Sequence, residues 1–360
     1  MSTTSENLLP GITSRTVDTP RLRVNVLEHR SESSGSGVPV VFVHGNCSSS
    51  LFWQPLMRSL PGDSLAIDLR GFGDSEIKPV DATRGLGDFA DDVLATLDAL
   101  GIDRAHLVGW SMGGGVVQQV LITRPEAVAS LTLQAPVSPF GFGPTTADGA
   151  LLTPDGAGSG GGGANPAFVQ ALAGGDRSDG PGSPRTTYRV VYVGAGHRDE
   201  HEELWVTSML TTATGSDNYP GDSRPSPNWP GFAPGDRGVL NTMSPLHLNL
   251  SGIVDVTPKP PILWVRGDAD VIVSDSSGLD VNNLGKLGVL PAWPGESVAP
   301  PQPMVTQTRR VLDAYAAAGG SYREIVMPGV GHSPHLERPE EFRAALLSHL
   351  GVSPIFRSVV

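Results

Sequence analysis

Cysteine is almost absent from this sequence, and charged residues are few. Cys47 is the single cysteine among 360 residues, which excludes an internal disulfide and a metal cluster held by cysteines. Charged residues make up 17% of the chain and hydrophobic residues 39%, as in globular proteins and unlike disordered ones. The length allows one large α/β domain with an insertion, or two modest domains.

Long hydrophobic runs and a surplus of positive charge are also missing. No apolar run reaches the length of a transmembrane helix, and the polar N-terminus lacks the apolar core of a signal peptide. We therefore expect a cytoplasmic protein that does not use the membrane as a partner. The formal net charge of −12 argues against nucleic acid and anionic membrane surfaces as partners. The sequence does not indicate an oligomeric state.

Glycine and proline, in contrast, are abundant, with 45 and 32 residues. They cluster in a segment that includes the run DGAGSGGGGANP at 155–166. Two stretches of this segment have helical patterns, 166–174 and 197–210. A structureless loop of such length is uncommon unless it is functional. We therefore predict that residues 138–249 (the first insertion) form a loop-rich, partly helical lid or cap domain.

The rest of the chain, 1–137 and 250–360, is expected to form the core domain. Short apolar runs alternate there with helical patterns, which is typical of a parallel sheet wrapped by helices. The predicted fold class is thus α/β, with a mostly parallel doubly wound sheet. A second insertion, 274–303, interrupts this core between a strand and a helix. The expected strands are 22–29, 38–45, 64–69, 105–110, 130–136, 261–267 and 322–329, and the expected helices are 89–101, 112–125, 304–320 and 338–350.

The segment HLVGWSMGGG, residues 106–115, places a serine between a buried strand and a helix. Within it, GWSMG (109–113) fits the pattern G-x-S-x-G in the strand–turn–helix context of a nucleophile elbow. The turn is so tight that side chains beside it would collide, which explains the glycines. It projects Ser111 Oγ at a helix N-terminus, where the positive end of the helix favours developing negative charge. We predict Ser111 as a nucleophile; the alternative is a Gly–Ser turn without chemistry.

A serine nucleophile needs a base that is oriented by an acid. His332 follows the last strand, at the sheet edge where reacting groups gather. It is the predicted base, with His335 as the fallback. The acid precedes the histidine in chain order, and Asp268 and Asp270 both follow a buried strand. We prefer Asp270 as the acid and expect the other aspartate to turn the chain by bonding backbone amides.

Acyl transfer also needs two donors for the oxyanion. One is the N–H of the residue after the nucleophile, here Met112, and the other lies in a loop after an early strand. The loop VFVHGNCSSS (42–50) meets this description. Asn46 is the predicted second donor through its backbone N–H, and His44 is expected to brace the loop.

Together these motifs resemble the α/β-hydrolase superfamily, in particular its lidded esterases, lactonases and C–C-bond hydrolases. The resemblance covers 1–137 and 250–360, and it implies Ser111, Asp270 and His332 as a catalytic triad that needs no cofactor. The two insertions depart from the usual pattern and leave the substrate open. The motifs, in family order, are HGN (44–46), DLRGFGDS (68–75), GWSMGG (109–114), GDAD (267–270) and GHSPHLERP (331–339). The second of these is structural in the family, and the serine in the third argues against a dehalogenase, whose elbow carries aspartate.

The implied activity is hydrolysis of a small-molecule ester through an acyl-enzyme. Trp110, Trp53, Trp205 and Met209 are predicted to contact the substrate, which suggests a largely apolar one. A lactonase, a C–C hydrolase, or a ligand-binding receptor with slow turnover are the alternatives. One further alternative is a zinc site, because HRDEH (197–201) matches H-x-x-E-H. We predict no metal, because that helix face continues with apolar residues.

Overall fold

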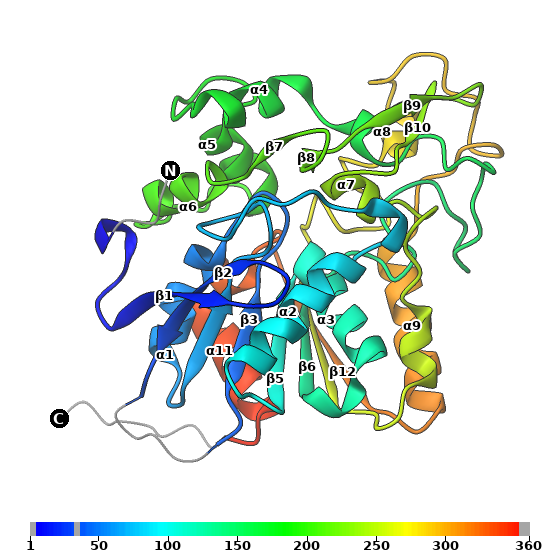
Figure 1. Ribbon diagram of the computed structural model, residues 1–360. Coiled ribbons are helices and arrows are strands. Elements are labelled where there is room, and N and C mark those ends of the chain that lie inside the picture. Colours follow the sequence, from blue (N-terminus) through cyan, green and yellow to red (C-terminus); the bar gives the residue numbers. More distant parts are fainter. Residues whose placement is uncertain (1–4, 32–36, 353–360) are drawn as a thin grey trace.

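The centre of the structure is an eight-stranded β-sheet (Figure 1). The computed structural model describes residues 5–31 and 37–352. The strands are β1 Ile12–Asp18, β2 Arg23–His29, β3 Val40–Val43, β4 Ser64–Ile67, β5 Ala105–Trp110, β6 Val128–Gln134, β11 Ile262–Gly267 and β12 Tyr322–Met327. They lie in the order β1-β2-β4-β3-β5-β6-β11-β12. Strand β2 is antiparallel to β1 and β4, and all other pairs are parallel. The predicted α/β class with a mostly parallel sheet is confirmed.

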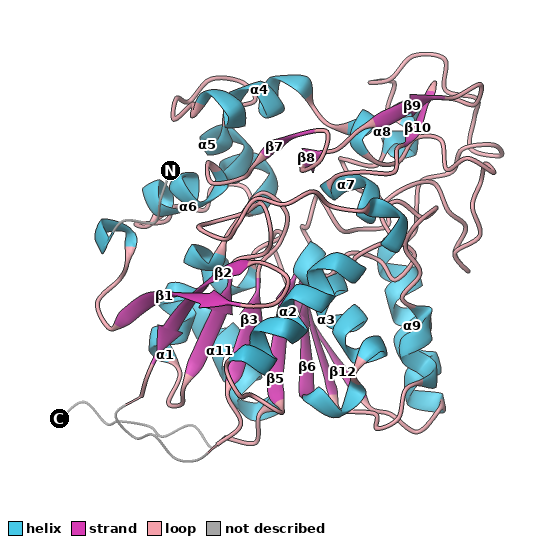
Figure 2. Cartoon of the chain, in the orientation of Figure 1, coloured by secondary structure: helices cyan, strands magenta, loops and turns pink. Residues whose placement is uncertain are grey.

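Helices cover both faces of this sheet (Figures 1 and 2). They are α1 Gln54–Ser59, α2 Gly87–Ala99, α3 Met112–Thr123, α9 Met304–Ala317, α10 Pro334–Glu337 and α11 Pro339–His349. Helices α2, α3 and α9 lie on one face, and α1 and α11 on the other. In α2, Phe89, Val93 and Leu97 recur every four residues and are fully buried, whereas Asp98 is exposed. This apolar stripe is what fixes the helix against the sheet.

The two insertions lie on the same side of the sheet (Figure 1). The first contains α4 Pro166–Gly174, α5 Pro184–Thr187, α6 Glu202–Met209, β7 Thr214–Gly215, β8 Tyr219–Pro220, β9 Ser223–Pro225, β10 Phe232–Pro234 and α7 Val239–Thr242, and the second contains α8 Val281–Lys286. Trp229 Nε1 donates to Pro291 O at 3.0 Å, and the N–H of Gly143 donates to Gln302 Oε1 at 2.8 Å. Both hydrogen bonds thus join the first insertion to the second.

Strand β1 and the short helices α1 and α10 were missed, and the start of α6 was predicted wrongly. Strand β1 was not predicted, because only Ile12 and Val17 of its seven residues are buried, so an edge strand shows no clear alternation. Helix α6 begins at Glu202 rather than at residue 197. The reason is Asp199, whose carboxylate accepts the backbone N–H of His201 at 2.8 Å. This local bond holds the preceding residues in a turn.

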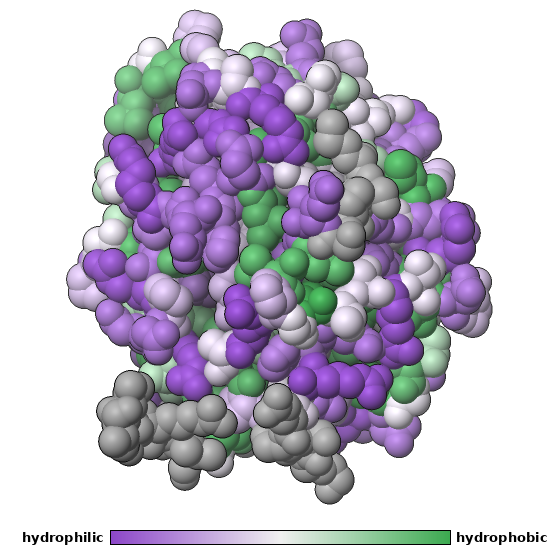
Figure 3. Space-filling view, turned by 90° about the vertical axis from the view of Figure 1, so that its left-hand side faces the viewer, coloured by the Kyte–Doolittle hydropathy of each residue, from purple (hydrophilic) through white to green (hydrophobic). Residues whose placement is uncertain are grey.

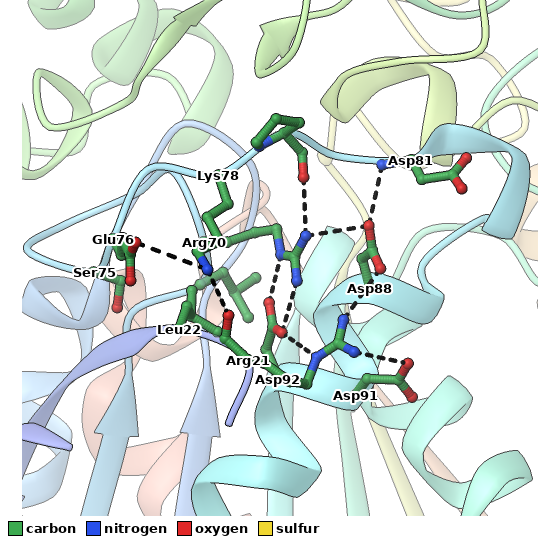
Figure 4. A network of polar contacts seen from close by, with 12 residues as sticks. Arg21, Leu22, Arg70, Ser75, Glu76, Lys78, Asp81, Asp88, Asp91 and Asp92 are labelled. Atoms are coloured by element: carbon green, nitrogen blue, oxygen red, sulfur yellow. Dashed lines mark hydrogen bonds and ion pairs between the residues drawn. The ribbon is translucent and has the colours of Figure 1, made fainter. Parts of the chain in front are cut away.

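A buried cluster of ion pairs supports the segment beneath the first insertion (Figure 4). The Arg70 guanidinium donates to Asp92 Oδ1 at 2.8 Å and to Asp88 Oδ2 at 3.2 Å. All three side chains are less than 10% exposed. Asp88 also accepts the N–H of Asp81 at 3.1 Å, and Asp81 forms a β-bridge with Arg237 of the first insertion. The loop that contains Arg70 therefore has a structural role, as the resemblance implied.

Replacing Arg70 with methionine is expected to lower the free energy of unfolding by about 3 kcal/mol, because breaking a buried ion pair leaves carboxylates without a full set of partners. The matched control is Arg237→Met. Its side chain is 53% exposed and pairs with Asp217, so the loss should stay below about 1 kcal/mol. Urea unfolding of both variants measures the difference. Equal losses would contradict the structural importance of the buried cluster.

The surface in Figure 3 is mainly hydrophilic, with hydrophobic residues gathered in a central strip. Within residues 5–31 and 37–352, no helix combines the length and apolar character needed to cross a bilayer.

Candidate active site

Ser111 occupies a strained turn between β5 and α3. Its φ of 56° and ψ of −120° lie where residues with a side chain are rare. The turn is held on both sides: the N–H of Ser111 donates to Gln134 O at 2.9 Å, and its carbonyl accepts the N–H of Val137 at 3.0 Å. Ser111 is thereby fixed at the N-terminus of α3, as the sequence pattern predicts.

The glycines that flank Ser111 are required by close packing. A Cβ on Gly109 would lie 2.3 Å from the carbonyl oxygen of Gly113, and a Cβ on Gly113 would lie 2.4 Å from that of His44. Both contacts are with backbone, which cannot move aside cheaply. The pattern G-x-S-x-G thus reflects steric exclusion at two positions of this fold.

His332 lies in the loop between β12 and α10, and its ring contacts Asp270. Nδ1 is 2.8 Å from Asp270 Oδ2, and both side chains are 1% exposed. Because a carboxylate only accepts hydrogen bonds, Nδ1 carries the proton and Nε2 presents its lone pair, as a general base requires. The N–H groups of Ile272 and Val273 donate to the other carboxylate oxygen at 2.8 and 3.0 Å. They hold the acid in place.

Asp268 does not contact His332 but stabilises a turn. Its Oδ1 accepts the N–H of Gly329 at 2.6 Å, so it fastens the turn after β12. The geometry therefore favours Asp270 as the partner of His332 and Asp268 as the residue that organises the loop.

Ser111 and His332 line the same cavity, but no hydrogen bond joins their side chains in the described part of the chain. Catalytic hydrogen bonds are often long in the absence of substrate. Trp110 Nε1 donates to the carbonyl oxygen of His332 at 2.9 Å. This bond ties the strand that carries the serine to the loop that carries the histidine.

The loop after β3 presents the predicted oxyanion donor. Asn46 lines the cavity, and the next residue, Cys47, has a φ of 47°. Within residues 5–31 and 37–352, the N–H groups of Asn46 and Met112 donate to no other group of the protein, so both are available to an oxyanion. His44 braces the loop: Nε2 accepts the N–H of Leu69 at 3.0 Å, and Nδ1 donates to Gly45 O at 2.7 Å. Burial lowers the pKa of His44, which keeps its ring neutral.

The cavity in front of Ser111 has a volume of about 420 Å³, within the usual range for small-molecule sites. Its walls come from the core and from both insertions. Sequence reasoning missed most of them, because all of the insertion residues except Phe168 lie outside the stretches with a helical pattern. They include Phe142, Phe168, Val191, Tyr192, Leu240 and Met243 from the first insertion and Leu279, Val281 and Leu284 from the second.

Of the predicted substrate contacts, Trp110 lines the cavity, whereas Trp53, Trp205 and Met209 do not. The latter three are fully buried elsewhere. Trp53 packs against Phe42 with ring centroids 4.8 Å apart. Such large apolar side chains gain most by full burial, so we withdraw these three as substrate contacts.

The geometry does not support His335 as the base or a zinc site at residues 197–201. His335 is buried, and its Nδ1 accepts from Gln134 Nε2 at 2.7 Å, so it faces the core and not the cavity. His197 precedes helix α6 and therefore shares no helical face with His201. Among the described residues, no group of three or more His, Cys, Asp or Glu is placed to hold a metal ion.

Stability is expected to fall on acidification, because burial lowers the pKa of His335 to about 3. The unfolded chain takes up this proton below about pH 6.5, whereas the folded protein resists it. The stabilisation is therefore complete above pH 6.5 and is lost progressively as the pH falls toward 3. At pH 5 this histidine alone should cost about 2 kcal/mol.

Urea midpoints at pH 7 and pH 5 measure this loss. The variant His335→Asn should show a weaker dependence on pH. If both proteins lost the same amount, the effect would belong to other groups.

The sheet, the elbow and the histidine loop together have the arrangement of the α/β-hydrolase fold. The model of the α/β hydrolase fold family matches residues 38–160. 2-Hydroxymuconate semialdehyde hydrolase of Pseudomonas sp. (strain CF600) is 37% identical over 105 residues, which cover 28% of this chain and 37% of that protein. 2-Hydroxy-6-oxo-6-phenylhexa-2,4-dienoate hydrolase of Comamonas testosteroni is 35% identical over 116 residues, which cover 31% and 40%.

The chain thus matches about two fifths of the length of these curated relatives. A solved structure, carboxylesterase CesB of Bacillus subtilis, superimposes with a TM-score of 0.58. The superposition covers 96% of this chain and 93% of the esterase, at 16% identity. At this identity the likeness concerns the fold alone.

Proposed function

We propose that the protein is a serine hydrolase that cleaves a carboxylic ester of an uncharged, largely apolar small molecule through an acyl-enzyme, with residues 138–249 as its lid. One observation carries the proposal. The strained Ser111 lines one cavity together with Asn46 and with His332, whose ring is bonded to Asp270. Within the described residues, the N–H groups of Asn46 and Met112 donate to no other group of the protein.

In the proposed mechanism, Ser111 Oγ attacks the ester carbonyl carbon while His332 Nε2 takes the hydroxyl proton. The N–H groups of Asn46 and Met112 bind the oxyanion that forms. When the tetrahedral intermediate collapses, the C–O bond breaks and the leaving alkoxide takes the proton from His332. A water molecule, deprotonated by the same nitrogen, then attacks the acyl carbon and releases the acid and the free serine. Asp270 keeps the ring in the tautomer that this requires.

The cavity lining favours an uncharged substrate. None of the described residues that line it is Lys, Arg, Asp or Glu; the polar groups among them include Ser159, Asn165 and Thr187. A substrate carboxylate would therefore enter without a cationic partner, which is costly in an apolar site. The dienoate named for the Comamonas testosteroni enzyme carries such a carboxylate. The lining thus supports ester hydrolysis over that type of C–C cleavage.

Two p-nitrophenyl esters of equal chain length test this choice. Wild type should hydrolyse the octanoate at least about 100-fold faster, in kcat/KM, than the half-ester of octanedioic acid, because the terminal carboxylate has no partner. The octanoate should also exceed the butanoate at least tenfold, since each buried methylene gains about 0.8 kcal/mol. Equal rates for the charged and uncharged octanoyl esters would contradict the proposed substrate class.

A ligand-binding receptor with slow turnover would behave differently. It would release one equivalent of p-nitrophenol or none, and show no steady state. Continuous turnover of the octanoate ester therefore separates the proposed enzyme from that alternative.

A further inference from the structure

A short part of the first insertion contacts both catalytic loops. It begins at Tyr192, the last residue of the π-helix η6 Tyr188–Tyr192, and π-turns of this kind are frequent at functional sites. The Tyr192 hydroxyl donates to the carbonyl oxygens of Asn46 and Cys47 at 2.8 and 3.3 Å. In the opposite direction, Ser333 Oγ donates to the carbonyl oxygen of Tyr192 at 2.7 Å. One residue thus touches the oxyanion loop and the neighbour of His332.

Glu337 completes the connection on the histidine side. Its carboxylate accepts the N–H groups of Gly331 at 3.0 Å and Ser333 at 3.3 Å, which flank His332. It also accepts the N–H of Gly194 from the first insertion at 2.7 Å. The residue is 8% exposed, and no ion pair joins it within the described chain. Backbone N–H groups are therefore what stabilise this buried charge.

The first insertion at Gly194 and the His332 loop at Gly331 approach so closely that no side chain fits between them. A Cβ on Gly331 would lie 2.6 Å from the backbone nitrogen of Gly194, and a Cβ on Gly194 would lie 2.8 Å from Glu337 Oε2. The contact is thus a dense set of directed hydrogen bonds and not loose packing. It can fix the position of His332 to within the fraction of an ångström that catalysis needs.

We propose that Tyr192 and Glu337 are positioning residues. Together with Gly194 they form a bracket that holds the oxyanion loop and the His332 loop at the separation the reaction requires. This inference rests on the proposed function. Neither side chain takes part in bond making: Tyr192 acts through the peptide that follows the Asn46 donor, and Glu337 acts through the amides on either side of His332.

Tyr192→Phe tests the oxyanion side, because it removes one hydroxyl and keeps the ring. With the p-nitrophenyl octanoate ester, kcat should fall about tenfold to 100-fold, below the loss known for deleting an oxyanion donor outright, while KM changes less than twofold. The matched control is Tyr315→Phe. Its buried hydroxyl donates to Pro260 O, which precedes β11 at the end of the parallel strands opposite Ser111, and kcat should stay within twofold of wild type.

Glu337→Gln tests the histidine side in the same assay, with Glu341→Gln as its control. Glu341 is 66% exposed, and its variant should match wild type. Glu337→Gln should lower kcat at least tenfold at unchanged KM. Because this variant alters a buried charge, its melting temperature is measured as well. A fall in kcat that persists well below the melting temperature belongs to positioning and not to unfolding.

Hydrogen exchange of the Gly194 and Gly331 amides, followed by NMR, tests the bracket without reference to activity. Glu337→Gln should speed exchange at both amides at least tenfold and leave amides of β5 unchanged. If wild type hydrolysed no ester but this local effect appeared, the proposed function would fail while the bracket itself stood. Unchanged exchange in Glu337→Gln, or a raised KM with unchanged kcat in Tyr192→Phe, would overturn the positioning role.

Discussion

Ser111→Ala should lower kcat for the octanoate ester by a factor on the order of 10⁶, to or near the background rate, because the hydroxyl that attacks the carbonyl is gone. The fold should be intact: alanine keeps the Cβ that already occupies this strained turn, and the flanking backbone bonds do not involve the hydroxyl. Steady-state kinetics and a urea unfolding curve measure the two effects separately.

Ser348→Ala is the control for this loss. Ser348 is exposed on helix α11 and does not line the cavity. The rate of its variant should therefore be unchanged. Retention of even 1% of the wild-type kcat in Ser111→Ala would contradict the assignment of the nucleophile.

Asp270→Asn should slow turnover by about 10⁴-fold. Asparagine keeps an oxygen for the N–H groups of Ile272 and Val273, but it brings an NH₂ group toward His332. That donor favours the tautomer with a proton on Nε2, which can no longer accept the proton of Ser111. The loss should appear mainly in kcat, because the acid does not line the substrate cavity.

The matched change Asp268→Asn should cost less than about tenfold, since the N–H of Gly329 is the one donor to that carboxylate among the described residues. The same kinetic assay ranks the two variants. A larger loss for Asp268→Asn than for Asp270→Asn would reverse the choice of acid.

The candidate site could be inferred from sequence because its chemistry is locally encoded. Gly109 is dictated by a backbone contact across the turn, and Gly113 by the backbone at the end of the neighbouring strand β3. The serine, the acid and the histidine each follow a parallel strand, and such strand ends meet at one edge of a sheet. The order of the core strands and longer helices was likewise visible in hydrophobic periodicity, except at the polar edge strand β1, whereas the short helices α1 and α10 were missed.

The substrate contacts could not be inferred in the same way. Trp53 and Trp205 are aromatic residues near the motifs, but they are fully buried in the core. The cavity wall comes instead from residues such as Phe168 and Leu284, which lie far apart in two irregular insertions. The helical pattern around Phe168 predicts a helix but not which cavity its side chain faces, because long-range packing and not local pattern brings the two insertions together. The contacts of Tyr192 and Glu337 also depend on this packing.

Covalent labelling of the nucleophile tests the central claim most directly. Wild type is incubated with an alkyl fluorophosphonate, a reagent that phosphonylates activated serine hydroxyls, and the digested protein is examined by mass spectrometry. The account predicts one adduct, on Ser111, formed in step with the loss of ester hydrolysis and absent from the Ser111→Ala variant. Ester hydrolysis that continues with Ser111 unlabelled, or an adduct at another serine that abolishes it, would contradict the account.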